Sequence, residues 1–167
     1  NDATITDNVG NNGPATWTGA PINSSGTRDG TREVHQIVKV TNKVSNTLTI
    51  SPALYYAYDI ATYDAEVLET SLMSGAGVED LWLERVTASS NYQESTGVGL
   101  ILTTGCWVKN VKTRYMDGGG VRMTYSFQDE VRHCDIGPNG LLNTSGHNYG
   151  IFTFGNGGYH LIIDNFL

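Results

Sequence analysis

Charged residues and cysteines are scarce in this chain of 167 residues. Charged residues make up 16%, against about 25% in an average soluble domain. Two cysteines, Cys106 and Cys134, provide neither a disulfide framework nor a zinc site of four cysteines. No apolar run approaches the ~18 residues of a membrane helix, so the sequence predicts no membrane span. The net charge of −7 argues against a nucleic-acid partner, because such a protein needs clustered lysines and arginines.

Small residues, mostly polar, are abundant in place of charged ones. Gly, Asn and Thr together form about a third of the chain, and all three are poor helix-interior residues. Only four prolines occur, and 10% of the residues are aromatic, which excludes a disordered low-complexity chain. This composition is typical of an all-β protein with many turns. The chain begins at Asn1 without a signal-peptide pattern, which we interpret as a removed signal peptide or an excised piece.

The N-terminal part contains a β-hairpin signal. Residues 36–41 and 47–51 each alternate apolar and polar side chains, and the turn-rich residues 42–46 separate them. This pattern predicts two antiparallel strands joined by a short turn. Residues 3–6 read as a further short strand, and residues 64–73 are the one stretch that suits a helical turn.

From residue 76 onward an internal repeat predicts the fold. Four short apolar patterns begin at positions 81, 106, 131 and 161, so that the first three are evenly spaced and the fourth follows after a slightly longer interval. A unit of two or three short strands cannot bury its apolar face alone, but a stack of such units can. Because parallel strands one coil apart then pair, we predict a parallel β-helix, or solenoid. Its expected inward positions are Leu81, Leu83, Cys106, Val108, Val131, His133 and Ile163.

The repeat also predicts bends and a division of the chain. Asn and Asp tolerate left-handed backbone conformations, and we expect a stacked bend at Arg85, Asn110, Asp135 and Asn165. Residues 1–75 form an irregular segment with the hairpin, and residues 76–167 form the coils of one continuous domain. At about 25 residues per coil, that stretch holds fewer than four coils, so we expect the chain to be a truncated piece of a longer β-helix.

The rungs at Gly77–Val86, Gly105–Val111 and Asp129–Ile136 resemble those of pectate-lyase-like right-handed parallel β-helix proteins. They are most similar to bacterial proteins related to polygalacturonase-type glycoside hydrolases. The resemblance covers roughly residues 30–167 and includes the hairpin with the aromatic stretch after it. It implies a right-handed coil and a carbohydrate-active protein that binds or cleaves a polysaccharide along its lateral face. It also implies an extracellular or cell-surface location.

The candidate catalytic residues are Asp117, Asp135 and His147. Glycoside hydrolysis needs two carboxyl groups about 5–10 Å apart, and His147 lies in a Gly-His-Asn sequence that partly matches the Gly-His-Gly of the resembling hydrolases. The chain lacks their Asn-Thr-Asp, Asp-Asp and Arg-Ile-Lys motifs. Enzymatic activity, as a hydrolase or a lyase, therefore stays open. No metal ligands and no cofactor are predicted, and Ca²⁺ enters only if the protein is a lyase.

Trp107, Tyr149 and Arg122 are the candidate substrate-binding residues. Trp107 as an outward ring and Tyr149 as a ring near a loop could stack on sugar faces, and Arg122 is an outward arginine that a lyase would use. The alternative function is structural, as a β-helix segment of a surface fibre, an adhesin or a phage tailspike that associates end to end. Residues 161–167 form a strand pattern with no capping sequence. An uncapped coil exposes unpaired strands, so we expect further coils or another copy of the chain to cover this end.

Overall fold

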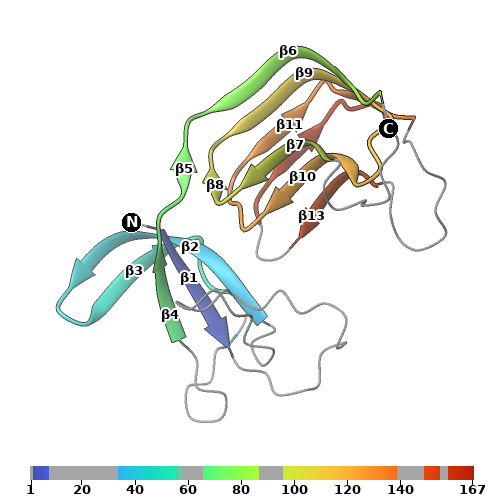
Figure 1. Ribbon diagram of the computed structural model, residues 1–167. Helices are drawn as coiled ribbons and strands as arrows, with labels where there is room; N and C mark the ends of the chain where they lie inside the picture. Colours follow the sequence, from blue (N-terminus) through green and yellow to red (C-terminus); the bar gives the residue numbers. More distant parts are fainter. Residues whose placement is uncertain are drawn as a thin grey trace. The chain divides into compact units, whose positions relative to one another are not determined.

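The computed structural model describes residues 2–7, 34–55, 57, 66–86, 96–138, 149–154 and 158–167. The chain divides into two compact units, Asn1–Leu72 and Met73–Leu167. Every regular element in the described residues is a β-strand (Figure 1). The all-β prediction is therefore confirmed.

The first unit contains one antiparallel sheet with the strand order β3-β2-β1-β4. The strands are β1 (Asp2–Asp7), β2 (Val34–Val44), β3 (Thr47–Ser51) and β4 (Glu66–Thr70). The predicted hairpin is confirmed, since β2 and β3 pair across a turn at Ser45, whose φ is 55°. The helical turn predicted at residues 64–73 is wrong, because β4 pairs with β1 and this sheet pairing overrides a weak local preference.

The second unit consists of parallel sheets. Its strands are β5 (Met73–Ser74), β6 (Gly77–Glu84), β7 (Thr96–Ile101), β8 (Thr103–Thr104), β9 (Trp107–Arg114), β10 (Gly119–Thr124), β11 (Glu130–Arg132), β12 (Asp135–Ile136), β13 (Tyr149–Phe154) and β14 (Leu161–Ile163). One sheet joins β5 and β8. A second places β9 between β6 on one side and β11 with β12 on the other, and β14 follows β11. The third has the order β13-β10-β7 (Figure 1).

The pairing register shows that the sheets are stacked in successive layers. Gly77 pairs with Trp107, Trp107 with Glu130, and Glu130 with Leu161. These four residues hold equivalent positions, and we number the layers one to four by their strands β6, β9, β11 and β14. Fewer residues separate the equivalent positions of the second and third layers than separate those of the first and second, or of the third and fourth. The predicted near-regular spacing is wrong, because the segments between the strands differ in length from layer to layer.

The core lies between these sheets and is built from apolar rows. Val78, Val108, Val131 and Ile162 occupy one row, and Val108 and Val131 are completely buried. The buried core cluster contains Val98, Leu100, Cys106, Val108, Val111, Val121, Met123, Val131, Cys134 and Ile136.

The predicted inward positions are only partly right. The prediction is confirmed for Cys106, Val108 and Val131, which are buried, and Leu83 packs against the core cluster. Leu81 also lies in an inward row, because it pairs in register with the buried Val111, and its 42% exposure reflects its place in the first layer, which pairs with a neighbouring layer on one side only among the described residues. The prediction is wrong for Ile163, since its neighbour Ile162 takes the inward row, and for His133, which is exposed.

Glycines let the third sheet approach the second closely. Gly97 and Gly120 occupy neighbouring strands of the third sheet. A Cβ atom on Gly97 would lie 2.6 Å from the Gly120 carbonyl oxygen, and a Cβ on Gly120 would collide with Ile136 and lie 2.8 Å from Thr113 Oγ1. Because any side chain would push the sheets apart, these positions need glycine.

One corner of the stack repeats a left-handed residue in all four layers. These residues are Asp80, Asn110, His133 and Asp164, with φ values of 54°, 50°, 52° and 51°. Asn110 Nδ2 donates a hydrogen bond to Asp80 Oδ1 at 2.6 Å, and His133 Nε2 lies 3.4 Å from Asp164 Oδ2. Asn110 was therefore placed correctly at the bend. Arg85, Asp135 and Asn165 were not, because the unequal steps between layers shift the true alignment.

Candidate functional site

Asp117 lies in a buried ion pair. Its side chain is 1% exposed, and it pairs with Arg85, which follows the end of β6. The residue sits between β9 and β10, so the pair ties the first layer to the turn of the second. The carboxylate that the sequence nominated for catalysis thus contacts an arginine in the interior.

Asp135, the second nominated carboxylate, lies on β12 and is partly exposed. Its Oδ2 accepts a hydrogen bond from Arg114 at 2.6 Å and lies 3.3 Å from Lys112 Nζ. The Arg114 hydrogen bond, with a smaller contribution from Lys112, lowers the pKa of Asp135. A general acid needs a raised pKa, so this environment suits a fixed anion. Asp117 and Asp135 therefore engage different cations, and His147 lies outside the described residues.

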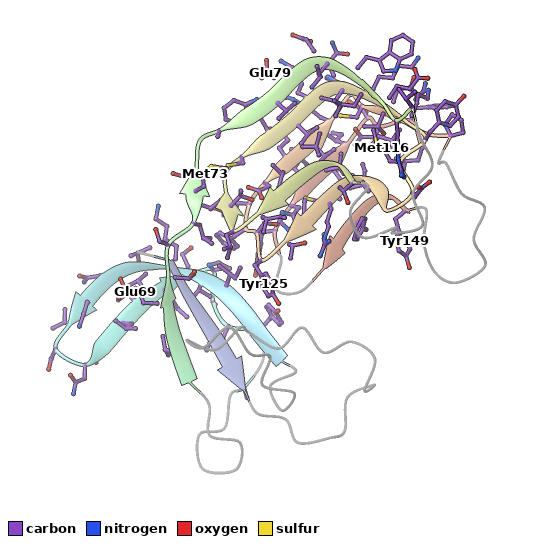
Figure 2. All side chains as sticks on the ribbon, in the orientation of Figure 1. Glu69, Met73, Glu79, Met116, Tyr125 and Tyr149 are labelled. Atoms are coloured by element: carbon purple, nitrogen blue, oxygen red, sulfur yellow. The ribbon has the colours of Figure 1, made fainter. Side chains whose placement is uncertain are left out.

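Trp107 lies on β9, next to Gly77 of the neighbouring strand. Any Cβ on Gly77 would collide with the indole ring, so the ring packs directly on the glycine backbone. The indole Nε1 donates a hydrogen bond to Glu79 at 2.6 Å, and Figure 2 labels Glu79 on β6. Trp107 is therefore held by its own sheet. Trp82 on β6 is more exposed than Trp107, at 61%, and Lys112 Nζ lies 5.1 Å from its ring centroid.

Arg122 and Tyr149 converge on Phe152 in the third sheet. Arg122 is paired in register with Phe152 of the adjacent strand β13, and its guanidinium carbon lies 5.9 Å from the Phe152 ring centroid. The Tyr149 and Phe152 rings are 5.2 Å apart with an interplanar angle of 41°. Arg122 Nε also donates to Thr124 Oγ1 at 2.9 Å. We call Arg122, Phe152 and Tyr149 the Arg122–Phe152–Tyr149 cluster.

The cluster lies on the outer face of its sheet. Val121 and Met123, which flank Arg122, are completely buried, so Arg122 points to the opposite side. The Phe152 ring lies over Gly119, where a Cβ would come within 2.6 Å of Phe152 Cε1. Tyr149, labelled in Figure 2, is 48% exposed. Exposed rings of this kind stack on sugar faces, and a guanidinium donates strong hydrogen bonds to carboxylates and sulfates.

A buried polar network lies inside the stack. Asp129 has no exposed surface, and it accepts hydrogen bonds from Thr103 Oγ1 at 2.5 Å and from the Cys106 N–H at 2.8 Å. The Asp129 N–H donates to His160 Nδ1 at 3.3 Å. His160 Nε2 lies 3.5 Å from Ser126 Oγ. Sequence patterns did not reveal this network, because a buried carboxylate becomes recognisable only once the register places Thr103 and Cys106 beside it.

The network contains Ser, His and Asp but is not a hydrolytic triad. In a triad, Nδ1–H donates to the carboxylate and Nε2 accepts the serine proton. Here Nδ1 accepts from the Asp129 backbone N–H, so the neutral ring carries its proton on Nε2, toward Ser126. Ser126 is also completely buried. These groups therefore have a structural role.

The described parts of the chain contain neither a disulfide nor a cluster of metal-binding side chains. Cys106 and Cys134 are both free and buried, and burial raises the pKa of Cys134. Across the described ranges, no three His, Cys, Asp or Glu side chains come close enough together to hold a metal ion. Nor do these ranges contain a helix of the length and apolar character needed to cross a membrane.

Comparisons with protein-family models, with curated proteins and with solved structures gave no match for this chain. The parallel sheets agree with the resemblance to pectate-lyase-like proteins at the level of the all-β architecture. Fold and surface chemistry therefore carry the functional proposal.

Proposed function

We propose that the unit Met73–Leu167 is a stretch of right-handed parallel β-helix that binds an acidic polysaccharide on the outer face of its third sheet. The pairing register supports the helical part of the proposal, because each strand meets its counterpart one layer later in all three sheets. This is the arrangement that a coiled chain produces. The resemblance to pectate-lyase-like proteins then implies the right hand and an extracellular or cell-surface location.

The Arg122–Phe152–Tyr149 cluster carries the binding proposal. Two residues that the sequence nominated independently, Arg122 and Tyr149, meet the same phenylalanine ring. Carbohydrate sites commonly combine an aromatic platform with a few polar groups that fix orientation. The cluster offers both within two adjacent strands.

The charge on these strands favours an acidic ligand. Arg122 is the one charged residue in the three strands β7, β10 and β13, although the chain as a whole carries a net charge of −7. The local positive charge pairs with a carboxylate or a sulfate, and the overall negative charge limits long-range attraction. Contact at the cluster, more than steering from a distance, then provides the affinity.

Binding fits the geometry better than cleavage. An acid-catalysed glycosidase needs a carboxyl group that keeps its proton near neutral pH and reaches the glycosidic oxygen. Arg114 and Lys112 lower the pKa of Asp135, and Asp117 is buried against Arg85. The proposed activity is therefore recognition, and a Ca²⁺-dependent lyase reaction has no ligand set among the described residues.

A polysaccharide panel tests the proposal. Isothermal titration against polygalacturonate, dextran sulfate and neutral dextran should show binding to an acidic polymer and none to neutral dextran. Arg122→Gln and Tyr149→Ala should each weaken binding about tenfold or more. Arg132→Gln is the matched control, because Arg132 lies on β11 and pairs with Glu130 at 2.9 Å. Absence of binding by the unaltered protein, or equal losses for Arg122→Gln and Arg132→Gln, would overturn the proposal.

A second candidate function, as a self-associating segment of a surface fibre, adhesin or tailspike, is favoured by the fourth layer. β14 pairs with β11 along one edge, and its Leu161, Ile162 and Ile163 are 51%, 48% and 42% exposed. Exposed apolar strands tend to pair with further strands. The candidate occupant is another copy of the chain or a further coil.

Size-exclusion chromatography with electron microscopy tests this second candidate. Association should disappear in the double variant Ile163→Lys with Phe166→Lys, since lysine protects strand edges. An unaltered protein that remains a discrete monomer at all concentrations would contradict self-association.

A further inference from the structure

Most strand glycines in the described residues of the second unit have a structural reason. Gly77 lies under the Trp107 ring, and Gly97 and Gly120 sit where two sheets approach. Gly119 has a φ of 146° and lies under Phe152. Each of these positions would resist a side chain.

Gly99 on β7 has no such reason among the described residues. Its φ lies outside the left-handed region, and the nearest described side chain to a Cβ there would be Ile101, at ordinary contact distances of 3.5 and 3.6 Å. Val98 and Leu100 on either side are buried, so position 99 faces outward and is exposed. Glycine weakens a strand interior, and it often marks a bulge, a tight bend, or a place where a ligand or another backbone approaches closely. The register of β7 with β10 runs without a shift through Val98, Gly99 and Leu100, so Gly99 does not mark a bulge.

The register places Gly99 beside the proposed binding cluster. Arg122 pairs with Gly99 of β7 on one side and with Phe152 of β13 on the other. Residues paired in register share one face of a sheet. On the outer surface, Arg122 therefore has the Phe152 ring of β13 on one side and the exposed backbone of Gly99 of β7 on the other.

We propose that Gly99 is a specificity-determining residue of this site, where the anionic group of an acidic sugar approaches the backbone of β7 to reach Arg122. This inference rests on the proposed polysaccharide binding and adds the position of the ligand. The sugar ring stacks on Phe152 and Tyr149, and its carboxylate or sulfate lies over Gly99. A side chain at position 99 would occupy that volume.

Graded substitution at position 99 tests the inference. Gly99→Ala and Gly99→Val are compared with the unaltered protein by titration with polygalacturonate and with dextran sulfate, which separates carboxylate from sulfate recognition. Gly99→Val should weaken binding about tenfold or more, and Gly99→Ala should weaken it less. The Tm of both variants should be unchanged or raised, since valine and alanine strengthen a strand relative to glycine. Arg132→Gln, on β11 of the second sheet, is again the control and should bind normally.

Three results would overturn the inference. Normal binding by Gly99→Val, with binding lost in Tyr149→Ala, would leave the polysaccharide site standing without Gly99. A lower Tm for Gly99→Val would show that the fold itself requires glycine there. If the unaltered protein binds neither polymer, the inference and the proposed function both fail.

Discussion

Arg85 and Asp117 form an ion pair that joins the end of β6 to the turn between β9 and β10. The Arg85 side chain is 16% exposed and the Asp117 side chain 1% exposed. The Arg85 N–H also donates to the Arg114 carbonyl at 3.2 Å, so backbone and side chain hold the same corner. A pair this buried stabilises the fold mainly because removing one partner leaves the other charge uncompensated.

Replacing Asp117 by Ala should destabilise the protein by about 3 kcal/mol, the lower end of the range for a broken buried pair, because Arg85 retains some contact with water. Urea unfolding measures the change. Asp135→Ala is the control and should change stability little, since exposed ion pairs contribute weakly. Equal destabilisation by the two variants would contradict the structural assignment of Asp117.

Gly120→Ala should cost about 1–3 kcal/mol, because the new Cβ collides with Ile136 between two packed sheets. The free energy of unfolding in urea is the measurement. Gly99→Ala provides the comparison, since its Cβ meets only Ile101. If both substitutions have the same effect on stability, the claim that Gly120 is needed for the close approach of the two sheets would be contradicted.

The sequence repeat predicted the parallel pairing but not its register. The alternation of Cys106, Val108 and Val131 places their side chains inward whatever the coil length. The alignment of Leu81 with Cys106 failed, because the structure pairs Leu81 with Val111. Steps of unequal length cannot be read from short apolar patterns, since a shift of one residue moves a side chain to the other face. His133 and Ile163 were misplaced for this reason.

The stability of the fourth layer should fall at acid pH through His160. Burial lowers the pKa of His160 below its ordinary value of 6.5, although the Asp129 charge opposes the shift. The unfolded chain therefore binds the proton more readily than the folded one. The stabilisation is present above pH ~6.5 and is lost as the pH falls through the folded-state pKa. Protonation also removes the Nδ1 lone pair that accepts the Asp129 N–H.

Unfolding measured between pH 7.5 and 5 checks this prediction. His160→Gln should flatten the pH dependence, because a glutamine amide can accept and donate without titrating. His133→Gln is the control from the exposed corner, where His133 lies 3.4 Å from Asp164, and it should retain the loss of stability at acid pH. A pH dependence in His160→Gln equal to that of the unaltered protein would contradict the role of His160.

Thr103→Val should destabilise the protein by about 1–3 kcal/mol, because it removes a donor to the buried Asp129 carboxylate. Thr113→Val is a matched control on a second buried threonine. Thr113 Oγ1 has no hydrogen-bond partner among the described residues, so its replacement should be neutral or stabilising. Thermal and urea unfolding compare the two, and a larger loss from Thr113→Val would contradict the network.

For the candidate site too, residue type and pattern predicted individual residues, whereas their contacts depend on the strand register. Arg122 was predicted from its residue type and outward position, and Tyr149 as an aromatic residue near a loop, and both lie on the third sheet. Phe152 was missed, because its contacts with Arg122 and Tyr149 become visible only when β10 and β13 are paired in register. Asp117 was nominated as a surface carboxylate, yet its burial depends on Arg85 in another layer. Contacts between layers are thus what the sequence alone leaves undetermined.

Binding of an acidic polysaccharide at the Arg122–Phe152–Tyr149 cluster is best tested by chemical-shift mapping of the backbone amides during titration with an acidic oligosaccharide. We expect the largest changes on residues 97–101, 119–124 and 149–152, with β6 and β9 little affected. Changes concentrated on β6 and β9, around Trp82 and Trp107, or no changes at saturating ligand, would contradict it.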